Sequence, residues 1–288
     1  MTRMLTYIAI DAFRWLHRRK IRGLWRGLHT LSYLFPGLRQ LRMELPDGRF
    51  VYLDLREYSH ISLLLAGDYP EKHEENFIRS FVRKGDVILD IGAYYGVYTT
   101  LFSLLVGKEG KVHAFEPNIR MYHLLKKTVS GYPNVDLYSH GLSSQNGIAY
   151  LSEPTLDASM ATIRPVDKPY RTQVIELTTL DRFTEENHIY PTFIKCDVEG
   201  NEYYVVLGAK RLISTPQPPA WMIEHLKKLY QENSTRIEDL ISLFENSGRR
   251  YNYYLIREKL IPIIPSQNIP EGNIAVIPDW LLSRVSES

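Results

Sequence analysis

The chain has 288 residues, 44% of them hydrophobic, and a net charge of +2. This composition excludes a disordered chain, allows one sizeable core, and gives no global field that would favour nucleic acid. The single cysteine, Cys196, excludes an internal disulfide and a zinc site of several thiolates, which favours a reducing, cytoplasmic location.

The first 42 residues differ in charge from the rest of the chain. They hold nine Lys or Arg residues against one acid, Asp11, which makes +8 locally and leaves −6 for the remainder. Apolar residues recur at helical spacing from Leu5 to Leu16, but charges interrupt every apolar run, which excludes a signal peptide or a transmembrane span. We predict that residues 1–40 form a basic helical extension that ends near Pro36.

Two roles are open for residues 1–40. A basic amphipathic helix that carries Trp15 and Trp25 suits peripheral contact with an anionic membrane surface. Alternatively, the extension packs on the core or forms a dimer contact with a second subunit. We favour packing, because apolar stripes on helices usually serve packing.

Residues 41–83 are expected to lead into the main domain. Two β-type runs, Leu41–Leu45 and Phe50–Leu55, flank a Pro-Asp-Gly turn and predict a β-hairpin. Residues 57–83 have a helical pattern that is broken at Gly67–Pro70.

From Lys84 onward, short β-branched runs alternate with helical patterns. Such alternation predicts a parallel sheet with helices on both faces, so residues 84–288 are expected to form one Rossmann-like α/β domain of about seven strands. The predicted strands are Asp86–Ile91, Lys111–Phe115, Val135–Ser139, Thr192–Asp197, Ala220–His225, Tyr251–Arg257 and Asn273–Ile277, and the predicted helices are Tyr95–Val106, Arg120–Ser130, Thr178–Glu186, Asn201–Leu212 and Thr235–Asn246.

The alternation is interrupted after residue 141. The run Gln145-Asn146-Gly147 is typical of a hairpin turn. The polar stretch 152–172 holds three prolines and predicts a loop over one edge of the sheet. A long loop in a compact domain is often a lid or a substrate-binding element.

The first strand of the predicted sheet ends in a loop that suits a bound ligand, Asp90-Ile91-Gly92-Ala93-Tyr94-Tyr95-Gly96. Ligands of open parallel sheets lie beyond the carboxyl ends of the strands. We expect Gly92 to let the backbone turn and a ligand approach, and Gly96 to let the helix pack closely on the strand. The glycine spacing fits neither a dinucleotide fingerprint nor a P-loop. An acid before the first glycine suits a ligand with a cationic part, such as the amino group of methionine.

The second strand ends in another acid, Glu116, followed by Pro117. An acid at the end of the second strand can bind both hydroxyls of a ribose. Glu116 follows Asp90 by 26 positions, which is the length of one helix and one strand. The two acids together predict a ribose-bearing ligand with a cationic group.

Four segments, taken in order, carry a family pattern: Asp90–Gly96, Ala114–Pro117, Gly141–Ser144 with Gly147, and Phe193–Gly200. With these segments the chain resembles the FkbM family of S-adenosylmethionine (SAM)-dependent methyltransferases, over about residues 60–226. Its Thr179–Phe183 is also similar to the family's Thr-Leu-Asp-x-Phe. The resemblance implies a class I methyltransferase fold, SAM bound across the first two strands, and methyl transfer to a hydroxyl of a small molecule or glycan.

The resemblance also implies a set of cofactor-binding residues. The family usually has Asn where Tyr94 stands and Asp where Ser144 stands, so side-chain contacts at these two positions are expected to differ. The expected SAM site consists of Asp90, Gly92, Ala93, Tyr94, Gly96, Glu116, Pro117 and Asp197, with Ser139, His140 and Leu142 beside the adenine.

Charged residues stand in two strands that are expected to be apolar. Lys195 and Asp197 lie two positions apart, so they share a face of their strand and can pair with each other. The next strand ends in Glu224 and His225, and if the two strands are neighbours, Asp197, Glu224 and His225 can cluster. For a hydroxyl acceptor, alignment with the activated methyl group does most of the work, and a general base adds to it. Lys195, Asp197, Glu224 and His225 are the candidate catalytic residues, with Asp197 as base or orienting group.

No metal site is predicted. Carboxylates at Asp197, Glu199 or Glu224 would suit Mg²⁺, but their spacing matches no defined metal motif. Glu199 and Glu202 are interpreted as acids that favour the N-terminus of the following helix.

Two other functions compete with an O-methyltransferase. Because Tyr94 departs from the family pattern, the fold could serve as a non-catalytic binding module that docks a membrane or protein partner through its basic N-terminus. Methylation of nucleic acid is the third option, but the chain lacks the aromatic-Pro-Pro-aromatic motif and its core is acidic, so no nucleic-acid partner is expected.

Overall fold

The computed structural model describes residues 13–19, 23–67, 71–155, 157–163, 165–232 and 235–285. Its main sheet is built from strands that lie between Val87 and Pro278. They are β3 (Val87–Ile91), β4 (Lys111–Phe115), β5 (Val135–Tyr138), β9 (Phe193–Cys196), β10 (Ala220–His225), β11 (Tyr251–Ile256), β12 (Leu260–Pro262) and β13 (Gly272–Pro278).

The strands of this sheet are arranged in the order β12-β11-β13-β10-β9-β3-β4-β5. The five neighbouring strands β10, β9, β3, β4 and β5 are parallel. Beyond β10, β13 runs antiparallel to β10, β11 runs antiparallel to β13, and β12 runs antiparallel to β11. The chain turns from one half of the sheet to the other between β3 and β9, which makes their carboxyl ends the topological switch point. The Rossmann-like, class I arrangement predicted from the sequence is confirmed, with eight strands in place of about seven.

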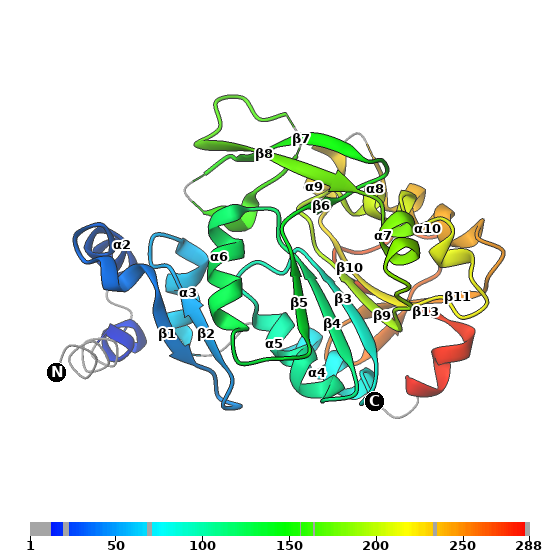
Figure 1. Cartoon of the computed structure of the whole chain (residues 1–288), viewed down its shortest axis with the longest axis horizontal. Helices are drawn as coiled ribbons and strands as arrows, with labels where there is room; N and C mark the ends of the chain where they lie inside the picture. The colour runs from blue at the N-terminus through cyan, green and yellow to red at the C-terminus, as the bar shows by residue number, and fades with distance from the viewer. Residues whose placement is uncertain are drawn as a thin grey trace.

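Helices cover both faces of the sheet, as Figure 1 shows. On one face α4 (Lys72–Phe81) and α5 (Val97–Val106) bury Phe81 and Phe102. On the other face α7 (Leu180–Glu186), α8 (Glu202–Leu207) and α10 (Ile237–Glu245) pack around Phe183, Trp221 and Phe244. Two further helices that follow strands of this sheet are α6 (Ile119–Thr128) and α9 (Lys227–Glu232).

The N-terminal elements pack on the side of this domain. They are α2 (Leu24–Leu34), β1 (Leu41–Glu44), β2 (Phe50–Leu53) and α3 (Tyr58–Ala66), and β1 pairs with β2 as the predicted hairpin. Leu28 of α2 and Leu64 of α3 share an apolar cluster with Tyr95 and Val97, which belong to the main domain. The predictions for residues 1–12 and 20–22 lie outside the described residues. Within the described ranges, no helix is long and apolar enough to cross a membrane.

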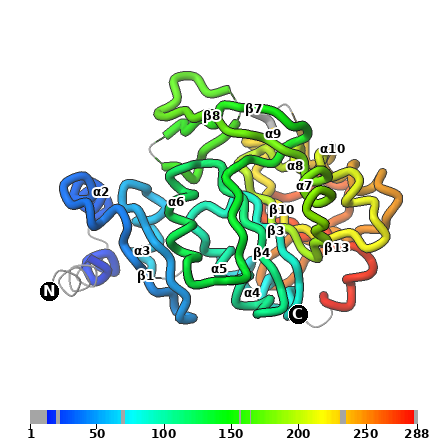
Figure 2. The backbone as a smooth tube through the Cα atoms, in the orientation of Figure 1, coloured from blue at the N-terminus to red at the C-terminus, as the bar shows by residue number. Residues whose placement is uncertain are grey.

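A second, three-stranded sheet lies above the carboxyl ends of the main strands (Figure 2). It contains β6 (Gly141–Leu142), β7 (Gly147–Glu153) and β8 (Arg171–Thr178) in the order β6-β8-β7. The prediction of a hairpin at residues 145–147 is therefore wrong, because β6 and β7 flank β8 and do not pair with each other. The predicted loop 152–172 shrinks to the segment between β7 and β8. The helix predicted from Thr178 begins at Leu180, since β8 extends through Thr178.

Candidate functional site

A cavity of about 420 Å³ opens at the carboxyl ends of β3, β4, β9 and β10, beneath the second sheet. Its volume is within the range of about 300–1,000 Å³ that small-molecule sites occupy. Most of the wall is apolar, and a few polar groups converge on it. The apolar wall includes Ile91, Phe115, Pro117, Leu142, Ile163, Ile175 and Leu177, and the polar groups include Ser59, Glu71, Tyr94, Glu116, Asp197, Glu199, Asn201 and Glu224.

The loop after β3 is fixed by its backbone. The N–H groups of Gly92 and Ala93 both donate to the carbonyl of Phe115, at 3.1 and 2.9 Å. Gly92 has φ +78°, and a Cβ at this position would lie 1.9 Å from the carbonyl oxygen of Asp197. The close approach that requires this glycine is therefore made by the loop after β9, whereas the sequence suggested an approaching ligand.

Gly96 has a different neighbour from the one expected. A Cβ at Gly96 would lie 2.7 Å from the Cδ1 of Leu125 and 3.2 Å from the Cγ2 of Thr128, both on α6. This glycine therefore lets the start of α5 approach a helix, whereas a strand was expected. Ala93 is buried beside Leu125 in the same apolar contact and is not on the cavity wall.

Glu116 is held rigidly at the cavity wall. One carboxylate oxygen accepts the N–H of Tyr94 at 2.8 Å and the other accepts the N–H of Asn118 at 2.8 Å. Burial raises the pKa of Glu116 to about 7, against the effect of these two bonds. Each oxygen keeps a further lone pair, so the group can still accept hydrogen bonds from two hydroxyls of a ligand.

Tyr94 connects the loop after β3 to two other parts of the chain. Its backbone has φ +52°, a left-handed conformation that Asn adopts more readily than an aromatic residue. Its hydroxyl lies 3.0 Å from the Oγ of Ser59 and donates to Asp157 at 3.1 Å. Asp157 also accepts the N–H of Ser59 at 2.7 Å. These bonds hold the segment between β7 and β8 against α3.

Asp90 lies beneath the loop and is not on the cavity wall. Its side chain is fully buried, and one oxygen accepts the hydroxyl of Thr99 at 2.6 Å. The other oxygen, Oδ1, has no hydrogen-bond partner among the described residues. Its register partner on the neighbouring strand is Lys195.

Lys195 connects the ends of β3 and β9. Its ammonium group donates to Asp197 at 2.9 Å and to the carbonyl of Gly92 at 3.2 Å, so Lys195 and Asp197 pair as their spacing suggested. Burial lowers the pKa of Lys195, but the charges of Asp197 and Asp90 outweigh burial and the pKa ends above its ordinary value. The lysine therefore stays charged at neutral pH.

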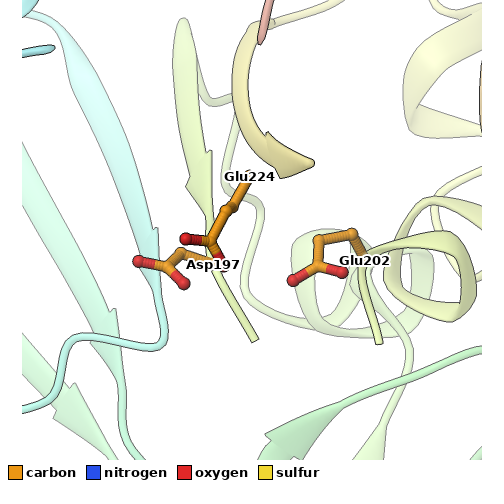
Figure 3. A group of neighbouring side chains, drawn as sticks. All are labelled: Asp197, Glu202 and Glu224. Carbon is orange, nitrogen blue, oxygen red and sulfur yellow. The ribbon is translucent and has the colours of Figure 1, made fainter. Parts of the chain in front are cut away.

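Three carboxyl groups converge at one end of the cavity. Figure 3 shows Asp197 after β9, Glu202 at the start of α8 and Glu224 near the end of β10. One carboxylate oxygen of each residue lies within 4.8 Å of one oxygen of the other two. The Oε1 of Glu202 accepts the N–H groups of Val198 and Gly200, at 2.9 and 3.2 Å. The charge of Asp197, followed by burial, raises the pKa of Glu224 to about 10, and burial raises that of Glu202 to about 7.

Two histidines predicted for the site lie away from the cavity. Adjacent residues of a strand face opposite sides of the sheet, so Glu224 turns toward the cavity and His225 turns away. The ring of His225 lies against Tyr230, and burial lowers its pKa. The cluster expected of Asp197, Glu224 and His225 therefore forms without the histidine. His140 packs against Phe115 and Tyr138, also away from the cavity wall, which Pro117 and Leu142 reach.

Several residues at the cavity were not predicted as site residues. Glu202 joins the carboxyl cluster, although its position at a helix start gave it a simpler explanation in the sequence. Ser59 and Glu71 reach the wall from the elements before the sheet, and Asn201 reaches it from the turn before α8. Only Asn201 and Glu202 had a usable signal, because they directly follow the segment that carries the family pattern.

A family model described as the methyltransferase FkbM domain matches residues 90–253. A search of curated proteins finds no match.

Similar solved structures are remote. One is a SAM-dependent O-methyltransferase from Thermotoga maritima, with 12% identity, a TM-score of 0.38, and coverage of 83% of this chain and 77% of that one. Another is a SAM-dependent methyltransferase from Aquifex aeolicus, with 14% identity, a TM-score of 0.40, and coverage of 72% and 87%. A third is the Aeropyrum pernix fibrillarin with natively bound SAM, with 14% identity, a TM-score of 0.40, and coverage of 72% and 74%.

Proposed function

Because this chain belongs to the FkbM family of methyltransferases and uses SAM as its cofactor, we propose that it methylates a hydroxyl of a sugar, a glycan or another small metabolite. The observation that carries the proposal is the position of two groups of acids in the cavity wall. The fixed carboxylate of Glu116 lies at the end of β4, in the first part of the wall, and Asp197 and Glu224 lie at the ends of β9 and β10, in the other part. When bound, SAM supplies a methyl group on a positively charged sulfur that is already activated for transfer.

The residues of the first part fit this cofactor. The two free lone pairs of Glu116 suit the two ribose hydroxyls, and Leu142 and Pro117 offer an apolar wall for the adenine. The unpartnered Oδ1 of Asp90 gives the floor beneath the loop a negative potential, which favours a cationic amino group above it. We assign Asp90 an electrostatic role, because a direct contact is not supported by its position under the cavity wall.

The residues of the other part suit a hydroxyl acceptor. A carboxylate at Asp197 can accept the hydrogen bond of a hydroxyl and then its proton. Lys195 stays protonated and cannot serve as a base, so we assign it a positioning role through its bond to Asp197. His225 is not proposed as a base, since it faces away from the cavity.

The proposal is tested with a panel of hydroxylated acceptors and isotopically labelled SAM. We expect methyl ether products from wild type. In Asp197→Asn, kcat should fall by at least about tenfold, in keeping with the loss of a general base, while the dissociation constant for SAM stays nearly unchanged. The matched control is Glu176→Gln, an exposed acid of β8, which should behave as wild type.

Two outcomes would contradict this proposal. Methylation only at nitrogen or at a carboxyl group would exclude a hydroxyl acceptor. SAM binding without transfer to any acceptor would favour the non-catalytic binding module.

A further inference from the structure

The carboxyl cluster of Asp197, Glu202 and Glu224 has more negative charge than its surroundings balance. Lys195 is the cation bonded to it among the described residues, and it bonds one oxygen of Asp197. Glu199 lies close enough to add to the negative potential at Glu224. Carboxylates this close repel one another in a region of low dielectric unless protons or a cation neutralise them.

Two oxygens of the cluster have no partner. The side chain of Glu202 is only 1% exposed, yet its Oε2 accepts no hydrogen bond from any described residue. The Oε2 of Glu224 is also buried and unpartnered. A buried carboxylate oxygen without a donor is costly, so each of these oxygens is poised for a ligand.

We propose that Asp197, Glu202 and Glu224 bind one divalent cation, Mg²⁺ or Mn²⁺, at this end of the cavity. All three donors are carboxylate oxygens, which hard cations prefer, and no thiolate or imidazole of the described residues joins them. At metal–oxygen distances of about 2.1 Å, neighbouring ligand oxygens lie about 3 Å apart and opposite ones about 4 Å apart, so oxygens now within 4.8 Å of one another would move inward by about 1–2 Å on binding.

The arrangement leaves room for further ligands. Glu202 is anchored by the oxygen that accepts two backbone N–H groups, and its carboxyl group is turned toward Asp197 and Glu224 (Figure 3). Asp197 and Glu224 both line the open cavity, so water or an acceptor can complete the coordination of the ion.

The role of the cation rests on the proposed function, whereas its binding does not. A divalent ion beside the acceptor would bind the hydroxyl oxygen and lower the pKa of that hydroxyl, which eases transfer of its proton to the Asp197 carboxylate. It would also orient the acceptor toward the cofactor end of the cavity.

The binding test uses the full chain without SAM or acceptor. Mn²⁺ is titrated and followed by electron paramagnetic resonance, and Mg²⁺ by calorimetry. We expect one Mn²⁺ per chain in wild type and at least tenfold weaker binding in Glu202→Gln and in Glu224→Gln. The control is Glu258→Gln, an exposed acid between β11 and β12, which should bind as wild type does.

The design guards against loss of the fold. A Gln at position 202 keeps an oxygen that can accept the N–H groups of Val198 and Gly200, so the start of α8 is preserved. Thermal melting followed by circular dichroism checks each variant. Absence of binding in wild type at millimolar Mn²⁺, or equal affinity in wild type and in both folded variants, overturns the proposal.

A parallel methylation assay with and without a chelator separates this inference from the proposed function. If Mn²⁺ binds but no hydroxyl is methylated, the cation site stands and O-methylation fails. If hydroxyl methylation survives the chelator and no Mn²⁺ binds, O-methylation stands and the cation site is overturned.

Discussion

At the scale of single residues, Glu116 illustrates how a carboxylate is prepared for a ligand. Both of its oxygens face backbone N–H donors, so a Gln at this position must turn its amide NH₂ toward one of them. Because a hydrogen bond to a charged group contributes about 1.5–3 kcal/mol, we expect Glu116→Gln to weaken SAM binding by about ten- to a hundredfold. Calorimetry with SAM measures the change, Glu176→Gln serves as the control, and an unaltered dissociation constant would remove Glu116 from the cofactor site.

Gly92 allows a test of the contact between two loops. Gly92→Ala combines a positive φ with a Cβ 1.9 Å from the Asp197 carbonyl, and we expect a loss of about 2 kcal/mol of stability or more. Gly85→Ala is the matched control, because Gly85 has a similar φ of +84° but open space around it. Thermal melting should show the larger loss for Gly92→Ala. If the two variants melt alike, the contact with Asp197 does not constrain the loop.

Single residues could be placed from the sequence where only one physical requirement explains their residue type. The pair of Lys195 and Asp197 could be predicted because charges in a central strand need partners. His225 could not be placed, because its face depends on the register of β10 against its neighbours, which strand propensity does not encode. Glu202 was hidden by a sufficient local explanation, the preference of acids for helix starts.

At the scale of elements, the segment between β7 and β8 depends on one side chain. Asp157 accepts hydrogen bonds from Ser59, Tyr94 and Ser159, and it thereby holds this segment against α3 and against the loop after β3. We expect Asp157→Ala to expose the segment to limited proteolysis and to weaken SAM binding about tenfold, because each lost bond contributes about 1 kcal/mol.

The control for this prediction lies in the same segment. Asp167 is exposed, so Asp167→Ala should be cleaved no faster than wild type. Equal protease resistance of Asp157→Ala and wild type would mean that other contacts hold the segment.

The main sheet could be predicted from its sequence more fully than the sheet above it. Strands such as Ala220–His225 are buried on both faces, and the apolar run Ala220–Ile223 makes this strand recognisable. In contrast, β8 exposes every second side chain and is rich in polar residues, so the sequence predicts no strand there, and only its two ends overlap the predicted loop and helix. The strand β12 has three residues and ends in proline, which is too short for a periodic pattern.

At the scale of the whole molecule, buried acids set the pH dependence of stability. Burial raises the pKa of Glu57 from 4.5 to about 7, and it raises the pKa of Glu116 to the same value. Between these values the native protein binds more protons than the unfolded chain, so stability falls as pH rises. Burial also lowers the pKa of His60 from 6.5 to about 4, which costs stability as pH falls through that interval.

The two slopes oppose each other below pH 6.5, and above it the acids dominate because the unfolded histidine progressively loses its proton. We therefore expect the melting temperature of the cofactor-free protein to fall between pH 6.5 and 7.5, and to fall less in Glu57→Gln. Glu258→Gln, at an exposed position, should follow wild type. A melting temperature that is constant or rises over this range would contradict the assignment of raised pKa values.

The N-terminal elements expose apolar side chains within a part of the sequence that is rich in Lys and Arg. Helix α2 buries Leu28 against the N-terminal cluster, in keeping with packing, but Leu34 and Phe35 remain 68% and 58% exposed. We propose that this exposed end contacts an anionic membrane surface.

Liposome sedimentation tests this proposal. Wild type should bind vesicles that contain phosphatidylserine, less so at high salt, and the double variant Leu34→Ser with Phe35→Ser should not. Ile148→Ser, which removes an equally exposed apolar residue from β7, is the control. If the double variant instead changes the oligomeric state, the surface is a subunit contact.

The ammonium group of Lys195 has a consequence for how the two substrates bind. It bonds the Gly92 carbonyl of the loop after β3 and the Asp197 carboxylate, so the proposed cofactor site and the proposed acceptor site share one cation. A ligand that shifts either bond alters the other, and such linkage is reciprocal: SAM changes acceptor affinity by the same factor by which the acceptor changes SAM affinity. The two substrates should therefore bind cooperatively, and Lys195→Met should make their binding independent.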